Sequence, residues 1–195
     1  ASLNPTTLWK WFGRPLASLT DQVREAGAVF GPAFPAFASA HQTLTTREAR
    51  LRHVADFLGA FARGKNHPAN VVDTALREIY QARGCLTTAD IRRKLPVSER
   101  YLQVLFKKKV GVSPMTYARL TRFNHLFLEY TRQAGAHSLG DLMALYDYYD
   151  ASHFNKDFRK FFGSAPSAVD LEQFQLLMEL VRKGPYLTTV SGPGS

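Results

Sequence analysis

The sequence predicts an all-α protein in which a long connecting helix joins two helix-turn-helix subdomains, preceded by a small helical N-terminal segment. Three observations predict this fold. Apolar residues recur at the period of a helix over most of the 195 residues, whereas stretches typical of strands are scarce. Capping residues and glycines mark where successive helices begin and end. A pattern of core residues at 101–114 recurs, 52 residues later, at 153–166.

The first 66 residues are expected to form a helical remnant of a larger N-terminal region plus a linker. A short helix is predicted to open at 19–23, and residues 30–35 are predicted to form a breaker-rich loop. After this loop, Thr45 or Thr46 can cap a helix that ends at the linker, residues 64–68. The repeat-containing domain is predicted over 67–183, and residues 184–195 are predicted to form a flexible tail.

Each helix of the repeat-containing domain has a start or a stop signal. A helix from about Asn70 ends at Gly84, and residues 87–90 form a capping box for a short helix through Leu95. The later helices are predicted at 99–110, 114–133, 139–146, 151–162 and 168–182. Ser98, Ser138 and Asp150 are the predicted caps of the first, third and fourth of these, and Ser113-Pro114 starts the second. The second copy of the repeat has one extra turn residue near 148–149.

Charge is concentrated in the first copy of the repeat. The chain carries a net charge of +9, and residues 92–132 alone carry ten Lys/Arg against two acids, whereas residues 133–180 carry three against seven. Such a balance favours nucleic acid as a partner. The second helix of a helix-turn-helix fits the major groove, and a connecting helix of about 20 residues would separate two such helices by ~30 Å, close to one B-DNA turn of ~34 Å. The sequence therefore predicts binding of double-stranded DNA at two successive major grooves.

Other function classes find little support in the sequence. No constellation of acid, base, nucleophile or metal ligands is present, so we expect neither an enzyme nor a cofactor or metal site. A single Cys suits a reducing cytoplasm, and no apolar run approaches the ~20 residues of a membrane span. The alternative is a helical adaptor that binds an acidic protein partner through the basic face at 92–132, without specific DNA binding.

Residues from about 70 to 169 resemble the C-terminal DNA-binding domain of AraC/XylS-type transcription regulators. The resemblance rests on two stretches: Val97-Ser98-Glu99-Arg100-Tyr101-Leu102-x3-Phe106-Lys107-x3-Gly111-Val112-Ser113-Pro114 and Tyr148-Tyr149-Asp150-x-Ser152-His153-Phe154-x3-Phe158-x3-Phe162-Gly163-x2-Pro166. It implies a bacterial, cytoplasmic transcription factor. Residues 12–21 look like the end of a sensor region, most of which is missing here. The resemblance leaves open RNA polymerase as a partner and a homodimer formed through that N-terminal region.

The resemblance also implies which residues face DNA. The candidates for reading bases are Arg100, Gln103, Val104, Ser152, Asn155 and Lys156, where Arg can bridge guanine and Gln or Asn can bridge adenine. The candidates for phosphate contact are Ser98, Lys107, Lys108, Lys109, Arg159 and Lys160. Because the two copies present different readers, the site on DNA is expected to be asymmetric. Because the first copy holds most of the charge, it is expected to supply most of the electrostatic affinity.

Two positions depart from the family pattern. Pro96 and Asp147 stand where the family usually has a Gly with positive φ between the two helices of each unit. Asp tolerates that conformation and Pro cannot adopt it, so the first turn must be built differently. Tyr146, Tyr148 and Tyr149 are interpreted as packing residues of the second turn, and His153 is interpreted as a structural residue.

Overall fold

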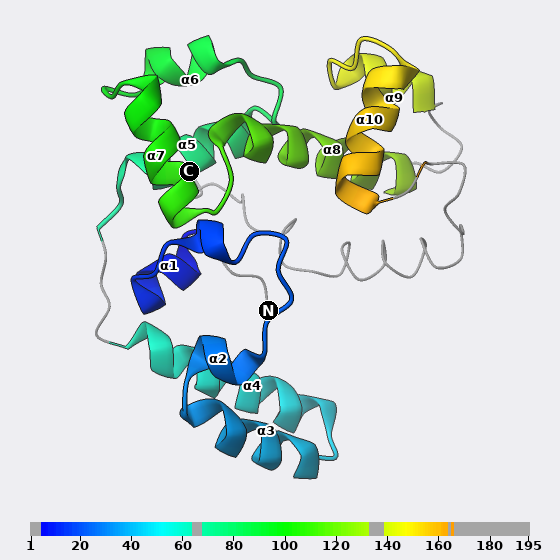
Figure 1. The fold of residues 1–195 in the computed structure, drawn as a ribbon. Helices are drawn as coiled ribbons and strands as arrows, with labels where there is room; N and C mark the ends of the chain where they lie inside the picture. Colours follow the sequence, from blue (N-terminus) through cyan, green and yellow to red (C-terminus); the bar gives the residue numbers. More distant parts are fainter. Residues whose placement is uncertain (1–4, 64–67, 133–138, 164, 166–195) are drawn as a thin grey trace, which may run out of the picture. The chain divides into compact units, whose positions relative to one another are not determined.

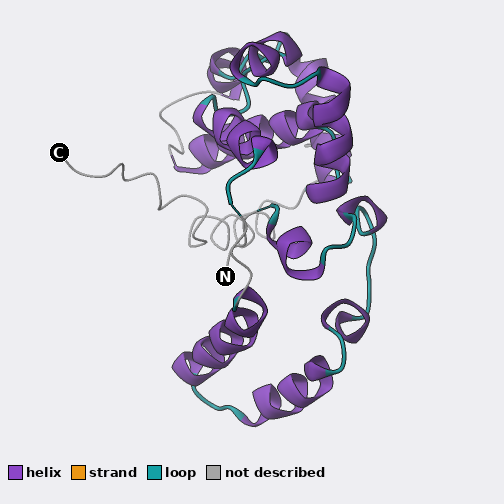
Figure 2. Ribbon diagram, turned by 90° about the vertical axis from the view of Figure 1, so that its left-hand side faces the viewer, coloured by secondary structure: helices purple, strands orange, loops and turns teal. Residues whose placement is uncertain are grey.

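The computed structural model describes residues 5–63, 68–132, 139–163 and 165. These residues form helices joined by loops, with no strand among them, as Figure 2 shows. The predicted all-α fold is thereby confirmed. The Ser138 cap, the helix at 168–182 and the tail at 184–195 lie outside the described residues. None of the helices described here combines the length and the apolar character that crossing a membrane would need.

The chain divides into two compact units. Among the described residues, unit 1 contains 71–103 and those from 113 onward, and unit 2 contains those up to 70 together with 104–112. Helix α7 (Glu99–Lys109) contributes its first turn to unit 1 and its remainder to unit 2.

Unit 1 is organised around α8 (Pro114–Arg132), the predicted connecting helix. Two helices lie toward one end of α8 and two toward the other, as Figure 1 shows: α5 (Val71–Gln81) and α6 (Thr88–Lys94), then α9 (Leu139–Leu145) and α10 (Ala151–Phe162). The second helix pair packs on α8 through an aromatic cluster. Phe123 of α8 stacks on Phe154 with ring centroids 5.9 Å apart and meets Phe158 edge-on at 5.6 Å. These rings are buried, as the apolar periodicity of α10 predicts.

Gly84 allows α5 to end against α8. Its φ is +76°, and the backbone N–H of Gly84 donates to the Ile79 carbonyl at 2.9 Å, which closes the helix as predicted. A Cβ on Gly84 would lie 2.2 Å from the Ala118 carbonyl oxygen and 2.5 Å from the Arg122 nitrogen. Glycine is therefore required here for its conformation and for the close approach of two helices.

Unit 2 contains α1 (Thr7–Phe12), a 3₁₀ turn (Leu16–Ser18), α2 (Ala26–Phe30), α3 (Ala33–Thr43) and α4 (Arg47–Ala62). Thr46 caps α4 by accepting a bond of 3.2 Å from the Ala49 N–H, so one of the two predicted caps is confirmed. Two predictions are wrong. No helix opens at 19–23, where Asp21 takes a positive φ of 56°. The predicted loop at 30–35 shrinks to 31–32, because Pro35 falls in the first turn of α3, where its missing N–H is tolerated.

The helices of unit 2 meet along a seam of aromatic rings. Phe37 and Phe57 stack with their centroids 4.1 Å apart, Phe37 also stacks on His53 at 4.7 Å, and Phe30 lies 5.6 Å from Phe61. None of the residues of α2, α3 or α4 is fully buried. The seam therefore holds the hairpin of α3 and α4 together while its rings remain half-exposed.

The C-terminal end of α7 packs within unit 2. The Lys109 ammonium lies 4.2 Å from the centroid of the Trp9 ring, within range of a cation–π interaction. The Thr20 hydroxyl donates to the Gly111 carbonyl at 3.0 Å. Gly111 has a φ of +97°, and a Cβ there would lie 2.7 Å from the Thr20 hydroxyl. The N-terminal segment and the residues just after α7 therefore fit closely.

Candidate nucleic-acid interface

Helix α7 is the second helix of the first helix-turn-helix. Its first turn is capped by Ser98, whose hydroxyl accepts a bond of 3.3 Å from the Tyr101 N–H, as predicted. Four of the candidate DNA-facing residues follow at i, i+3, i+4 and i+7 along one helix face, and all four are exposed: Arg100, Gln103, Val104 and Lys107. Val104 is 58% exposed, which argues against a core role for this apolar side chain. Lys108 is exposed as well, whereas Lys109 is half-buried.

Helix α10 repeats this arrangement in the second helix-turn-helix. The Asp150 carboxylate caps it by accepting a bond of 2.7 Å from the His153 N–H, as predicted. The residues that match the α7 face at an offset of 52 together line a single surface hollow of about 420 Å³: Ser152, Asn155, Lys156 and Arg159. The predicted base-reading residues of α10 thus share one surface with the predicted phosphate contact Arg159, and the next residue, Lys160, is exposed as well.

The two turns are built differently, as the departures from the family pattern predict. In the first turn, residues 95–98, Leu95 is extended with φ −126° and ψ 131°, and the Val97 N–H donates to the Leu95 carbonyl at 2.9 Å. In the second turn, residues 146–150, Asp147 takes the left-handed conformation with φ 55°. There the Tyr148 N–H donates to the Met143 carbonyl at 2.8 Å, which is the long bond of a Schellman motif. The second turn has the extra residue that the repeat offset predicts.

Helix α6 begins at the predicted capping box. The Thr87 hydroxyl accepts from the Asp90 N–H at 3.2 Å, and Asp90 Oδ2 accepts from the Thr87 N–H at 2.8 Å. Hydrogen bonds from Thr87, with a further bond from Arg93, lower the pKa of Asp90 to about 2. Two basic residues of α6 are committed to carboxylates, Arg93 to Asp90 and Lys94 to Glu78, the latter at 2.5 Å. The exposed Arg92 forms no such pair among the described residues.

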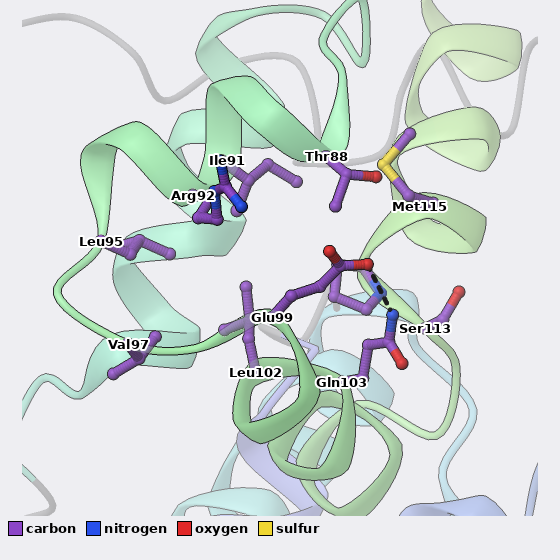
Figure 3. Close-up of a pocket in the computed structure, with 11 residues that line it drawn as sticks. Thr88, Ile91, Arg92, Leu95, Val97, Glu99, Leu102, Gln103, Ser113 and Met115 are labelled. Carbon is purple, nitrogen blue, oxygen red and sulfur yellow. Dashed lines mark hydrogen bonds between the residues drawn. The ribbon is translucent and has the colours of Figure 1, made fainter.

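Gln103 is engaged with a neighbour on its own helix. Its amide donates to the Glu99 carboxylate at 3.0 Å, the bond drawn as a dashed line in Figure 3. Both side chains border a small hollow of about 70 Å³, together with Ile91, Leu95 and Met115. The amide oxygen of Gln103 is not used by this bond. Glu99 thus holds Gln103 in place, and it also puts a negative charge beside the predicted reading face.

A buried ionic cluster joins α10 to α8. Asp157 is completely buried and pairs with Arg119 and with Arg122, whose guanidinium lies 3.7 Å from Asp157 Oδ2. The Tyr148 hydroxyl donates to the same oxygen at 3.3 Å, and the Arg122 guanidinium lies 4.5 Å from the centroid of the Tyr148 ring. Burial, followed by the nearby Asp157 charge, raises the pKa of Tyr148. Sequence reasoning missed this cluster, although an acid between Phe154 and Phe158 on an apolar helix face was a signal for it.

The tyrosines of the second turn divide into two kinds. Tyr146 and Tyr148 are buried, as the packing interpretation predicts, and the Tyr148 ring lies 5.1 Å from His153, in keeping with a structural role for that histidine. Tyr149 is 94% exposed, so the packing interpretation is wrong for this residue. It directly precedes the Asp150 cap of α10, which places an exposed phenol at the start of the second reading helix.

The described residues contain no group of three or more His, Cys, Asp or Glu side chains that could hold a metal ion. Cys85 is a half-buried free thiol whose pKa is raised by burial and by the nearby Asp147. The geometry therefore offers two capped helices with exposed polar faces and an ionic cluster beneath the second of them.

Comparisons with known proteins agree with this geometry. Residues 91–170 match the family described as a helix-turn-helix domain. The chain is also 36% identical over 83 residues to the uncharacterized HTH-type transcriptional regulator YidL of Escherichia coli (strain K12). That match covers 43% of this chain and 27% of the relative, so the chain spans about a quarter of the relative's length. No solved structure is significantly similar to this chain.

Proposed function

We propose that this chain binds double-stranded DNA sequence-specifically and regulates transcription as an AraC-type regulator, since residues 91–170 match a helix-turn-helix domain family and the chain is similar to an HTH-type transcriptional regulator. The observation that carries the proposal is the matched pair of exposed faces on α7 and α10. Each face begins at a capped helix N-terminus and presents polar side chains at i, i+3 and i+7. This is the placement from which the second helix of a helix-turn-helix meets base edges and phosphates in a major groove.

The connecting helix supports reading of successive grooves. Helix α8 has 19 residues, a length of about 28 Å at 1.5 Å per residue. One turn of B-DNA is ~34 Å. A connecting helix of this length would separate two reading helices at its ends by nearly one turn of the duplex, which is the spacing that reading of successive major grooves requires.

The two faces differ in chemistry, which supports an asymmetric site. At equivalent positions α7 carries Arg100 and Gln103, whereas α10 carries Ser152 and Asn155. Arg recognises guanine best and Gln or Asn recognises adenine, while Ser is compatible with several bases. We expect a G-containing half-site under α7 and a less strictly defined, A-containing half-site under α10.

Selection of bound sequences from a random duplex library tests the proposal. The expected result is one enriched motif with two half-sites about one helical turn apart. Arg100→Ala should weaken binding to that motif by roughly 5- to 150-fold, which corresponds to ~1–3 kcal/mol for a bidentate contact, and should relax the preference at one base pair. Arg47→Ala, which removes an exposed Arg from α4, is the matched control and should change little.

Binding to unselected duplex DNA separates this proposal from the adaptor alternative. A DNA-binding chain should give a retarded complex at moderate salt, with an affinity that falls as salt rises because counterions are released from the phosphates. The absence of any complex, or an affinity that does not depend on salt, would instead favour a helical adaptor that binds an acidic protein. Contact with RNA polymerase and homodimerisation are separate hypotheses.

A further inference from the structure

The buried carboxylate of Asp157 lies on the second reading helix itself. It occupies the inner face of α10 between Phe154 and Phe158, both buried, and it is fully buried too. A lone buried carboxylate is strongly disfavoured unless it is paired and hydrogen-bonded. Here Arg119 approaches it with two guanidinium nitrogens, Nη2 toward Oδ1 and Nε toward Oδ2 at 3.4 Å, and Arg122 and the Tyr148 hydroxyl complete the set of partners.

The first reading helix carries no buried carboxylate at the matching position. The position of α7 that matches Asp157 at the repeat offset of 52 is Leu105, a half-buried apolar side chain. Apolar contacts are non-directional and tolerate small rotations of a helix. A bidentate Arg–carboxylate pair fixes both distance and direction, because each of its hydrogen bonds weakens steeply when its angle changes.

From this difference we propose that Asp157 is the positioning residue of the second reading helix. The triad of Arg119, Asp157 and Arg122 holds α10 at one rotation on α8, and that rotation decides which base pairs meet Asn155 and Lys156. The inference rests on the proposed DNA-binding function, since it names how the second half-site is read. It assigns no direct DNA contact to Asp157.

The geometry sets the scale of the effect. A side-chain tip lies about 6 Å from the axis of its helix, so a rotation of α10 by about 20° moves that tip by about 2 Å. Hydrogen bonds to base edges tolerate only a few tenths of an ångström. Loss of the triad would therefore abolish discrimination of the second half-site, even where α10 remains folded and its Lys and Arg side chains still meet phosphates.

Tyr148 extends the network to the turn before α10. Its hydroxyl bonds to Asp157, and the Arg122 guanidinium stacks over its ring. The connecting helix, the turn and the reading helix are thus tied at one buried point. Arg119 and Arg122 are used in this tie, which removes two of the cations that the sequence places in the basic stretch from the set available to phosphates.

The decisive variant replaces the whole triad by apolar residues of similar size, Arg119→Met, Arg122→Met and Asp157→Leu together, in a Tyr148→Phe background, so that no buried hydroxyl loses its partner. Replacing a buried ionic triad in this way is often neutral or stabilising, so the variant should fold and melt near the wild-type temperature. Duplexes selected by the wild-type chain are then prepared with the first or the second half-site scrambled. Scrambling the second half-site should weaken wild-type binding by at least about tenfold, since each mismatched base pair typically costs about 1–3 kcal/mol.

In the triple variant, scrambling the second half-site should weaken binding less than about threefold, while scrambling the first should have its full wild-type effect. A purely structural role for the triad predicts a lowered melting temperature with discrimination intact. If the folded triple variant discriminates the second half-site as well as the wild-type chain does, the proposal is overturned. Asp141→Asn, at an exposed acid of α9, is the control for loss of a negative charge in the same unit.

A measurement without DNA separates this proposal from the proposed function. Amide hydrogen exchange of the free protein should speed up in the turn 146–150 and in α10 of Asp157→Asn, with little change in α5. If the wild-type chain fails to discriminate any duplex, the proposed function falls, and unchanged exchange in α10 would then also overturn the positioning role. Faster exchange with intact wild-type discrimination supports both.

Discussion

A single added methyl group at Gly84 should severely destabilise unit 1. Gly84 ends α5 with a φ of +76°, directly against the backbone of α8. In Gly84→Ala the new Cβ would lie 2.2 Å from the Ala118 carbonyl oxygen and 2.5 Å from the Arg122 nitrogen. Ordinary contacts of a Cβ begin near 3.4 Å, so the overlap with backbone exceeds one ångström. Neither neighbour can rotate away, because both are main-chain atoms within α8.

Two separate contributions make up the expected loss. A non-glycine residue in the left-handed region costs about 1–2 kcal/mol. Forcing an extra carbon into a packed contact costs about 1–3 kcal/mol more, and the larger value applies where backbone must move. We expect Gly84→Ala to lower the free energy of unfolding by about 4–5 kcal/mol, a large fraction of the ~5–15 kcal/mol of a typical domain.

Two control glycines separate these contributions. Gly163 also has a positive φ, +78°, but a Cβ there would meet nothing within 4 Å, so Gly163→Ala should show the conformational cost alone. Gly59 lies within α4, with neither a positive φ nor a neighbour within 4 Å. Gly59→Ala should stabilise its helix by about 0.5–1 kcal/mol.

Urea unfolding followed by far-UV circular dichroism measures all three variants. The two Trp residues of the chain, Trp9 and Trp11, both lie in unit 2, so their fluorescence reports on that unit separately. Gly84→Ala should shift the dichroism transition far more than the fluorescence transition. If Gly84→Ala costs no more than Gly163→Ala, the close approach of α5 and α8 is not as described, and the reasoning from it fails.

Three further predictions follow from individual contacts. Burial, and then the Arg83 charge, lowers the pKa of His125. The neutral imidazole therefore stabilises the fold above pH ~6.5, and this stability is lost as pH falls through the lowered pKa. The free energies of unfolding from urea titrations at pH 7.5 and 5.5 should differ less for His125→Gln than for the wild-type chain. Because the folded pKa of Asp90 is about 2, its contribution should persist above about pH 4 and disappear toward pH 2, and Asp90→Asn should flatten the loss of helicity over that range. Glu99→Gln should strengthen binding to any duplex by up to about fivefold in a titration at 0.1 M salt, and an unchanged affinity would place Glu99 away from the phosphates.

The caps and helix ends of the repeat could be predicted because they depend on residues within four positions of one another. Thr46, Thr87, Ser98 and Asp150 each bond to a backbone N–H three residues later. Pro96 and Asp147 likewise determine their turns locally, one by excluding a positive φ and the other by tolerating it. Local chemistry of this kind leaves few alternatives for tertiary structure to choose among.

Predictions failed where distant residues decide the conformation. Helix α3 begins with breakers, and its aromatic residues become a coherent face only against α4, where Phe37 meets Phe57. The ionic cluster at Asp157 needs the register of α10 on α8, which the sequence pattern does not supply. The exposed position of Tyr149 depends on the path of a five-residue turn, whereas its neighbours Tyr146 and Tyr148 are buried.

The ion pairs determine how many charged side chains each helix-turn-helix has available for DNA. By net charge, nearly all the positive potential lies in the first helix-turn-helix. Within residues 92–132, however, Arg93, Lys94, Arg119 and Arg122 are paired with carboxylates, and Lys109 lies over Trp9. Some exposed Lys and Arg side chains on α6, α7 and α10 form no ion pair among the described residues. Four belong to the first helix-turn-helix and three to the second: Arg92, Arg100, Lys107 and Lys108, then Lys156, Arg159 and Lys160.

The two helix-turn-helix repeats should therefore contribute more evenly to salt-dependent binding than their net charges imply. If Arg100 and Lys156 read bases, five of these basic side chains are left to meet phosphates, and at about 0.9 per neutralised phosphate the slope of log K against log salt should be near −4.5. Lys107→Ala on α7 and Arg159→Ala on α10 should each reduce its magnitude by about 0.9. If Arg159→Ala leaves the slope unchanged while Lys107→Ala reduces its magnitude, α10 does not meet phosphates. The first helix-turn-helix then supplies the electrostatic affinity, as the charge pattern of the sequence alone predicts.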